Sequence, residues 1–400
     1  MSNIGIGGIH DDYYIRNNQN GISDEGINLD DISVFYTTDK VENKRGSYAQ
    51  TFNEKPVNMS KDGQKFLDGL ISNKGLLCER LGLSDEQYDS LACIALGLAS
   101  QETGMGEEDG YVGENTGIGG VFRSAGKWWD VVIGGNGSAS SGVTQMKIND
   151  FMNKDTLTDN EKNLLKELGV ETWRVNGNNL FENPDKAAVA TVVVLNSIAQ
   201  NYDDYKSMLD NEHLRLGNEL SPMSSDEILS KGENIINAIV NSYKDAPPSE
   251  KPEIRGAFKQ WLLAQNGSVK GQRGVDKEFN EELQLQNFNA ILEKNGGNTL
   301  TQDDLNYIRY YLTSDTQELS MSQYCAYGWN KGTGATGMQL DRVLADKVGT
   351  ILANPEDFDY DQFTVNVTSL AKLYAQQTVL NATDDVLDNP FADYKFFGRD

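Results

Sequence analysis

The sequence predicts a mainly α-helical protein that contains a long glycine-rich loop and a helical insertion. Apolar residues such as Ala188, Val192 and Leu195 recur at helical spacing, which places them on one buried face of a helix. The 39 residues from 104 to 142 contain twelve glycines. Glycine at this density disfavours regular helix, and a loop of this length inside a compact domain is usually functional.

The charge of the chain excludes some classes of partner. The 400 residues include 35 basic and 60 acidic side chains, for a formal net charge of −25. Such an acidic protein is repelled by nucleic acids and by anionic membranes, so we expect neither as a partner. The longest apolar run, Leu91–Ala99, is half of what a bilayer span needs, so we expect no membrane span.

The cysteine and histidine content narrows the chemistry. Cys78, Cys93 and Cys325 form no CxxC pair, so they are interpreted as buried thiols, with a Cys78–Cys93 bridge left open. Two histidines, His10 and His213, are present, which disfavours His-based metal sites and Ser-His-Asp triads. We therefore expect no metal and no cofactor, and chemistry that depends on carboxylates.

Changes in composition divide the chain into five segments. These are an N-terminal extension (1–60, with a strand-like run at 32–37), the first part of a main helical domain (61–210), a helical insertion (211–318), a return segment of the main domain (319–353) and a C-terminal tail (354–400).

Capping signals place several helices. Ser84 with Gln87, and Ser224 with Glu227, have the spacing of capping boxes, and Asn183-Pro184 suits a helix start. Further helices are predicted over 224–243, 276–293, 301–312 and near 367–380.

Three separated segments, called pieces here, contain side chains suited to catalysis or to substrate binding. The first is Ala99–Gly104, in which Glu102 closes an apolar helix, and the second is Ser141–Met146, which contains Gln145. The third piece, 326–332, contains the side chains of Tyr327, Trp329 and Asn330.

Glu102 is the candidate for acid/base chemistry. A carboxyl group that is half-buried at the end of an apolar helix is disfavoured in its ionised form, so its pKa is expected to rise toward neutrality. Such a group can donate a proton and later accept one, as glycosidic bond cleavage requires. The alternative is an ordinary exposed residue at a helix end, because Glu-Thr-Gly is a common tripeptide.

The other two pieces also have a structural alternative. Gln145 can direct its amide toward a sugar or toward Glu102, or it can cap a loop. Tyr327, Trp329 and Asn330 can form a sugar-binding wall, or the two aromatic rings can belong to the core.

The pieces occur in the order Glu-Thr-Gly, Gly-Val-Thr-Gln-Met, an apolar helix and Trp-Asn-Lys-Gly. In this order they resemble the soluble lytic transglycosylase and goose-type lysozyme family. Glu102 falls on the acid/base of that family and Gln145 on its motif glutamine. Asn330 falls on the asparagine of the last motif, and Trp329 stands at its tyrosine position unless Tyr327 serves instead. The resemblance covers 84–209 and 320–350, and the glycine-rich loop would be an insertion.

The resemblance implies a lysozyme-like helical domain that cleaves the β-1,4 bond between N-acetylmuramic acid and N-acetylglucosamine in peptidoglycan strands. As a transglycosylase, the protein would use Glu102 alone. As a muramidase, it would use water and a second carboxylate. The candidates for that carboxylate, among which the sequence does not choose, are Glu107, Glu108, Asp109, Glu114 and Asp130.

A second class of function stays open beside the enzyme. A non-catalytic, lysozyme-like binding or structural component of a secretion or phage assembly would show similar motifs. The implied substrate lies outside the cytoplasm, whereas the first residues, MSNIGIGGIHDDYY, do not resemble a secretory signal. We therefore expect export by a signal-less route, or delivery by a phage.

Overall fold

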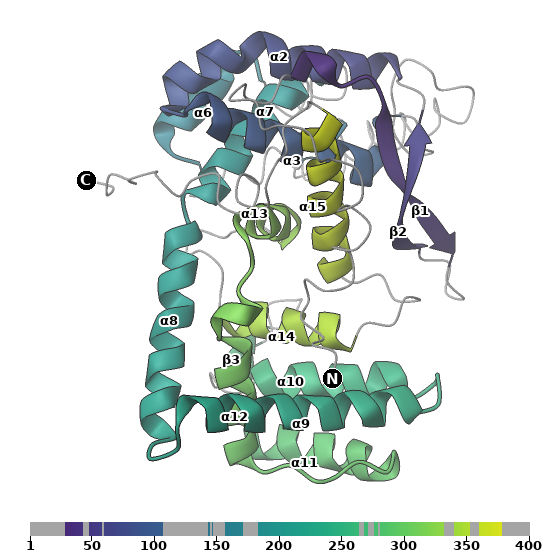
Figure 1. Cartoon of the computed structure of the whole chain (residues 1–400), viewed down its shortest axis with the longest axis vertical. Coiled ribbons are helices and arrows are strands. Elements are labelled where there is room, and N and C mark those ends of the chain that lie inside the picture. Colours follow the sequence, from purple (N-terminus) through teal and green to yellow (C-terminus); the bar gives the residue numbers. More distant parts are fainter. Residues whose placement is uncertain are drawn as a thin grey trace, which may run out of the picture. The chain divides into compact units, whose positions relative to one another are not determined.

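The structure of the protein is a computed structural model (Figure 1). It describes residues 29–42, 48–57, 60–106, 143–144, 146, 157–170, 183–263, 268–270, 276–278, 281–331, 340–352 and 360–377. These residues are mainly α-helical, which confirms the mainly helical part of the predicted fold class. The described strands form two antiparallel pairs, β1 with β2 and β3 with β4.

The chain divides into two compact units, which we treat separately. The described residues within 203–318 and 337–361 form one, which is called the helical unit here. The described residues within 17–202, 319–336 and 362–400 form the other, which is called the Glu102 unit.

The Glu102 unit contains a short hairpin and most of the helices that surround the candidate site. Its elements are η1 (Leu29–Asp31), β1 (Phe35–Glu42), β2 (Tyr48–Val57), α2 (Lys61–Leu81), α3 (Asp85–Thr103), α6 (Asp159–Glu167), α7 (Pro184–Ala199), α13 (Met321–Lys331) and all but the first two residues of α15 (Tyr360–Gln377).

The helical unit consists of helices and one small hairpin. Its elements are α8 (Tyr202–Glu219, from its second residue), α9 (Ser225–Asp245), α10 (Lys251–Leu263), β3 (Ser268–Lys270), β4 (Asp276–Glu278), α11 (Glu281–Lys294), α12 (Gln302–Leu312), η3 (Asp315–Gln317) and α14 (Leu340–Ile351).

Helix α3 forms the centre of the Glu102 unit. It begins at the predicted capping box, in which Ser84 accepts from the Gln87 amide and Gln87 accepts from the Ser84 amide. Sixteen of its 19 residues are buried, because α2, α7, α13 and β1 all pack against it. A helix that is buried on all sides has no solvent face and is fixed by its neighbours.

The helices around α3 also pack closely on one another. At Gly69 of α2, an added methyl group would lie 2.7 Å from the Cα of Asp185 in α7. Glycine therefore permits α2 and α7 to approach backbone to backbone. Asn183 is the N-cap residue of α7 and Pro184 its first helical residue, as predicted, although the Asn183 side chain makes no capping hydrogen bond to the first turn.

The predicted caps and helices of the helical unit also appear. Ser224 and Glu227 form the capping box of α9. The helix predicted over 276–293 begins only at Glu281, since Asp276–Glu278 forms β4 and pairs with β3. The helix expected near 367–380 is α15, which begins seven residues earlier, at Tyr360.

The unit boundaries differ from the expected segments at three places. Helix α14 lies in the expected return segment 319–353, yet it packs on α10 in the helical unit. The reason is apolar burial, because Leu344 and Val348 of α14 join the core cluster that contains Trp261.

The other two differences concern the expected extension and tail. Strand β1, from the expected extension 1–60, packs against α3. Helix α15, from the expected tail 354–400, buries Val367, Leu370 and Tyr374 completely. Both elements therefore contribute to the body of the Glu102 unit.

Between α2 and α3 lies a buried ion pair. Lys74 Nζ contacts the two carboxylate oxygens of Asp89 at 2.7 and 2.8 Å, and the Asp89 side chain is 1% exposed. Burial raises the pKa of Asp89 to about 6, against the opposing effect of Lys74. The ion pair thus joins the two helices, and the free-energy cost of burying the Asp89 carboxylate depends on pH.

This cost predicts a pH effect on stability. Between about pH 4 and pH 6 the folded protein keeps a proton on Asp89 that the unfolded chain releases. The contribution of Asp89 to the free energy of unfolding should therefore fall as pH rises through this window. In urea titrations at several pH values, the difference between wild type and Asp89→Asn should change across the window, and a constant difference would contradict the assignment.

Replacing two helical glycines by alanine should have opposite effects on stability. An added methyl group at Gly97 would lie 2.5 Å from the carbonyl oxygen of Val367, whereas at Gly75 it would meet nothing within 4 Å. We expect Gly97→Ala to lower the free energy of unfolding by about 1–3 kcal/mol. Gly75→Ala, the matched control, should raise it by about 1 kcal/mol. Chemical denaturation measures both, and equal effects would refute the close contact between α3 and α15.

Candidate functional site

Glu102 lies in the last turn of α3, where the buried helix reaches the surface of its unit. Ser100, Gln101 and Thr103 are buried, whereas Glu102 is half-buried. The helix ends at Gly104, which has a left-handed backbone (φ 53°) and donates its amide to Ser100. This places a carboxyl group at the boundary between an apolar core and the segment that follows.

The turn after Glu102 is held in an unusual conformation. Met105 also has a positive φ, 58°, which is uncommon and costly for a residue with a side chain. Its side chain is fully buried, its amide donates to Ala99 (3.2 Å), and its carbonyl oxygen accepts from Ser60 Oγ at 2.5 Å. These contacts fix the chain direction directly after the carboxyl group.

The structure brings the second predicted piece to the end of α3. Thr103 Oγ1 lies 2.7 Å from the carbonyl oxygen of Val143, to which it donates. Val143, Thr144 and Met146 are buried, and Thr144 Oγ1 lies 3.1 Å from Thr191 Oγ1 in α7. Val143 is thus attached to α3, next to Glu102, and Thr144 to α7.

The third predicted piece forms α13, which packs against α3 and α7. Tyr324 anchors this helix, because its hydroxyl donates to the carbonyl oxygen of Asn201 and its ring packs edge-on against Tyr202. Tyr327 is 3% exposed and Trp329 is 8% exposed, whereas Asn330 is half-buried. The two rings therefore lie mostly within the core, as the structural alternative for these residues expects.

Several predicted residues lie outside the described part of the chain. Gln145 is one of them, although its neighbours on both sides are described. The glycine-rich loop from 107 to 142 lies there too, and with it all five candidates for a second carboxylate. Their roles stay predictions.

A hydrogen-bond network that the sequence does not indicate supports the end of α3. Tyr374 of α15 pairs with Ser100 Oγ at 2.5 Å, accepts from the Tyr36 amide and donates to the Tyr36 carbonyl oxygen. Thr37 Oγ1 donates to the carbonyl oxygen of Ser100. Burial raises the pKa of Tyr374, so its hydroxyl stays protonated. Within α15, the tyrosine resembles any other apolar-face residue, so its sequence gives no signal of this role.

The cysteines of the described structure are all free, which removes the Cys78–Cys93 bridge left open above. Burial raises the pKa of Cys93 and of Cys325, and a protonated buried thiol is a poor nucleophile. Within the described ranges, no group of three or more His, Cys, Asp or Glu side chains has a geometry that could hold a metal ion.

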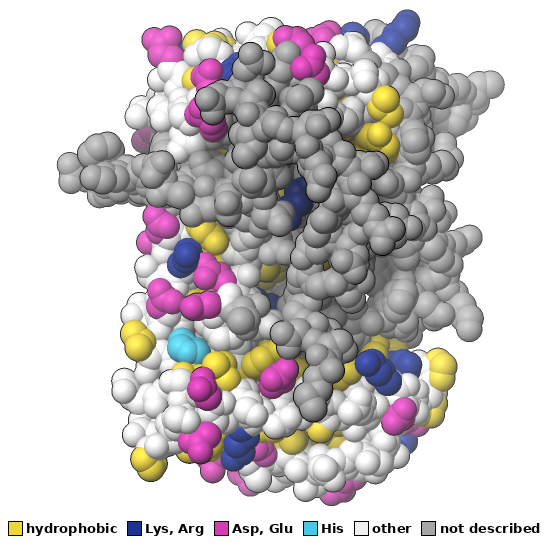
Figure 2. Space-filling view, viewed as in Figure 1, with side chains coloured by type: hydrophobic (Ala, Val, Ile, Leu, Met, Phe, Trp, Pro, Cys, Tyr) yellow, Lys and Arg dark blue, Asp and Glu magenta, His cyan; other side chains and the backbone are white. Residues whose placement is uncertain are grey.

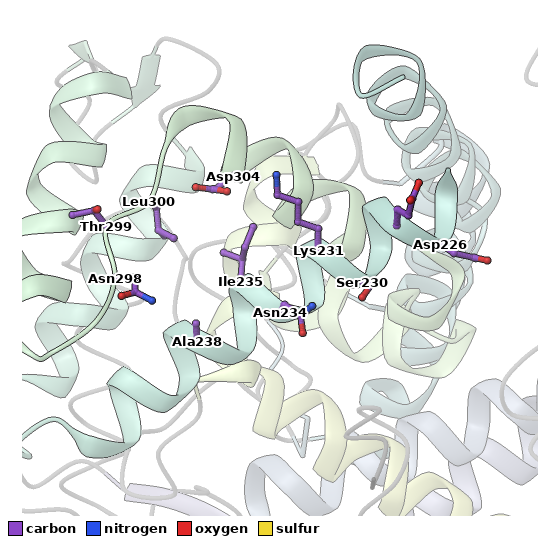
Figure 3. Close-up of a pocket in the computed structure, with 11 residues that line it drawn as sticks. Asp226, Ser230, Lys231, Asn234, Ile235, Ala238, Asn298, Thr299, Leu300 and Asp304 are labelled. Carbon is purple, nitrogen blue, oxygen red and sulfur yellow. The ribbon is translucent and has the colours of Figure 1, made fainter. Parts of the chain in front are cut away.

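The helical unit contains an open hollow of about 650 Å³. Figure 3 shows Ser230, Lys231 and Asn234 of α9 on one side of it and Asn298 and Leu300 on the other. The ammonium group of Lys231 lies over the ring of Tyr307, 3.8 Å from its centre, and this cation–π contact gives the lysine a structural role. Carboxylates also line the hollow, and two of them, Glu227 and Asp304, accept from the backbone amides of Ser224 and Thr301 in capping boxes.

The charges on the surface and the apolar character of the helices indicate which classes of partner are disfavoured. Figure 2 shows acidic side chains spread over the described surface on the face in view, with Lys and Arg side chains among them. This distribution agrees with the net charge of −25 and disfavours polyanionic partners. Among helices in the described ranges, none combines the length and the apolar character that crossing a membrane requires.

Comparisons with family models, with curated proteins and with solved structures find no match to this chain. The functional assignment therefore depends on the site itself and on the motifs that resemble the transglycosylase family.

The contact between Thr103 and Val143 gives a testable prediction. Thr103→Val removes the hydroxyl that donates to Val143 and leaves a buried carbonyl oxygen unpaired, which should lower the free energy of unfolding by about 1–3 kcal/mol. Thr103→Ser, the matched control, keeps the donor and should stay closer to wild type. Urea denaturation measures both, and equal losses would show that the hydroxyl does not attach Val143 to α3.

Proposed function

We propose that the Glu102 unit is a peptidoglycan-cleaving glycosidase of the lytic transglycosylase type, with Glu102 as its acid/base. The observation that supports this most is the position of Glu102, a half-buried carboxyl in the last turn of a helix of which 16 of the 19 residues are buried. The neighbouring residue Thr103 holds the segment that contains the second motif. Helix α13, which contains the third motif, packs on the same helix.

In the proposed reaction, the proton of the Glu102 carboxyl group passes to the oxygen of the glycosidic bond as the bond to the muramyl anomeric carbon breaks. The resulting carboxylate then takes the proton of the muramyl 6-hydroxyl, whose oxygen bonds to the same carbon. This closes a 1,6-anhydro ring and returns Glu102 to its protonated form. In a hydrolytic variant, water takes the place of the 6-hydroxyl and a second carboxylate assists.

One observation favours the second candidate function, a non-catalytic lysozyme-like component of a secretion or phage assembly. Tyr327 and Trp329 are 3% and 8% exposed, so their faces offer little area for stacking on a sugar ring. A protein that had kept the helical body for assembly rather than for catalysis would bury these rings in this way.

Zymography on purified peptidoglycan tests the proposal. Wild type should clear the substrate, and Glu102→Gln should lose at least about 100-fold of the activity, since the amide cannot donate the proton. Glu79→Gln is the matched control, because Glu79 is an exposed carboxylate on α2. It should clear as wild type does.

The products separate the two chemical variants and the two classes of function. Mass spectrometry should detect 1,6-anhydro-muropeptides if the 6-hydroxyl attacks, and hydrated muropeptides if water attacks. Equal clearing by wild type and Glu102→Gln would remove Glu102 from the mechanism. A folded wild type that clears nothing would favour the non-catalytic function.

A further inference from the structure

Two side chains of α15 cover one edge of β1 and of Val34, the residue before it. Gln377 Nε2 donates to the carbonyl oxygen of Val34 at 2.8 Å, and the Val34 amide donates to Gln377 Oε1 at 3.4 Å. The Tyr374 hydroxyl accepts from the Tyr36 amide at 3.0 Å and donates to the Tyr36 carbonyl oxygen at 3.2 Å. Two side chains on one face of a helix therefore bond both backbone groups of two strand residues.

These backbone groups face away from β2. Tyr36 stands opposite Pro56 in the antiparallel pair, and proline has no amide N–H to donate. Along a strand, the backbone groups of successive residues point alternately to one neighbour and to the other, so Val34 and Tyr36 present theirs on the side opposite β2. Within the described ranges, the sheet of β1 and β2 has no third strand. The α15 side chains thus take the places that the amides and carbonyls of a third strand would occupy.

The covered segment has the composition of a strand that pairs with copies of itself. Residues 32–37 read Ile-Ser-Val-Phe-Tyr-Thr, in which five residues are β-branched or aromatic and none is charged, proline or glycine. Six-residue segments of this kind self-associate when their edge is open. A charge or a proline within the segment would discourage such pairing, and here neither is present. Protection of this edge therefore has to come from another element.

We propose that α15 guards the edge of β1 against pairing with β1 of a second copy of this chain. A second copy is the partner because each molecule contains the same uncharged segment, and an extended strand matches the spacing of the covered groups. The guard is fixed to the core, since Tyr374 pairs with Ser100 Oγ at 2.5 Å and its ring packs edge-on against Phe35. The proposal does not depend on the proposed function, because Glu102 takes no part in it.

Sedimentation velocity of the full-length protein at several concentrations tests the proposal. In the double variant Tyr374→Phe/Gln377→Leu, both side chains keep nearly their size but lose the groups that bond β1. This variant should associate as concentration rises, to at least about twice the mass of wild type, because the open edge can pair with another strand. Gln376→Leu, the matched control, changes a half-buried glutamine of α15 that makes none of these bonds, and it should sediment as wild type does.

A suppressor variant identifies the surface that associates. Added to the double variant, Val34→Lys places a charge beside the edge and should restore the mass of wild type. Leu76→Lys makes the same change on α2, at a residue whose exposure, 38%, equals that of Val34, and should leave the association unchanged. In hydrogen exchange, the amides of Val34 and Tyr36 should exchange at least about tenfold faster in the dilute double variant than in wild type, and should slow again on association.

Either of two results would overturn the proposal. One is a double variant that has the circular dichroism and, at every concentration, the mass of wild type. The other is association that Val34→Lys does not reduce, or that Leu76→Lys reduces as much, since the associating surface would then lie elsewhere. If the double variant loses its helical circular dichroism, Gln377→Leu alone decides by the same criteria, because it changes a half-buried side chain in the last turn of α15.

Discussion

The burial of most of α3 is the constraint on which the Glu102 unit depends. Sixteen of its 19 residues are buried, so the polar groups among them must find partners inside the protein or cost free energy. Glu102 lies at the C-terminal end of this helix, where the requirement is relaxed. The environment of the carboxyl group follows from this position, with a core on one side and the turn at Met105 on the other.

The polar side chains of α3 attach the helix to several neighbouring segments. Toward its start, the Tyr88 hydroxyl donates to the carbonyl oxygen of Leu70 in α2, next to the Asp89–Lys74 ion pair. Near its end, Ser100 pairs with Tyr374 of α15, and Thr103 donates to Val143. Apolar contacts alone would let the helices slide, whereas hydrogen bonds at both ends fix their register. The end of α3 is therefore held from several directions, as a positioned carboxyl group requires.

Local features of this fold could be predicted from the sequence, and features that depend on tertiary packing could not. The capping boxes at Ser84 and Ser224 need only a few neighbouring residues, so their signal is complete within a short window. The position of α14 depends instead on the packing of its apolar face against the cluster that contains Trp261, a residue far from α14 in the sequence. The burial of Trp329 likewise results from the packing of α13 on α3 and α7. An aromatic residue beside a glycine looks the same in a sugar-binding wall and in a core.

Of the candidate site, the position of Glu102 at the end of α3 could be predicted, because a carboxyl that closes an apolar helix is visible in one segment. The network of Tyr374 and Ser100 could not, because it joins residues 274 positions apart. The polar groups of α3 discussed above have partners within the protein and serve to hold helices together. Their roles therefore follow from tertiary packing, which no short window of sequence contains.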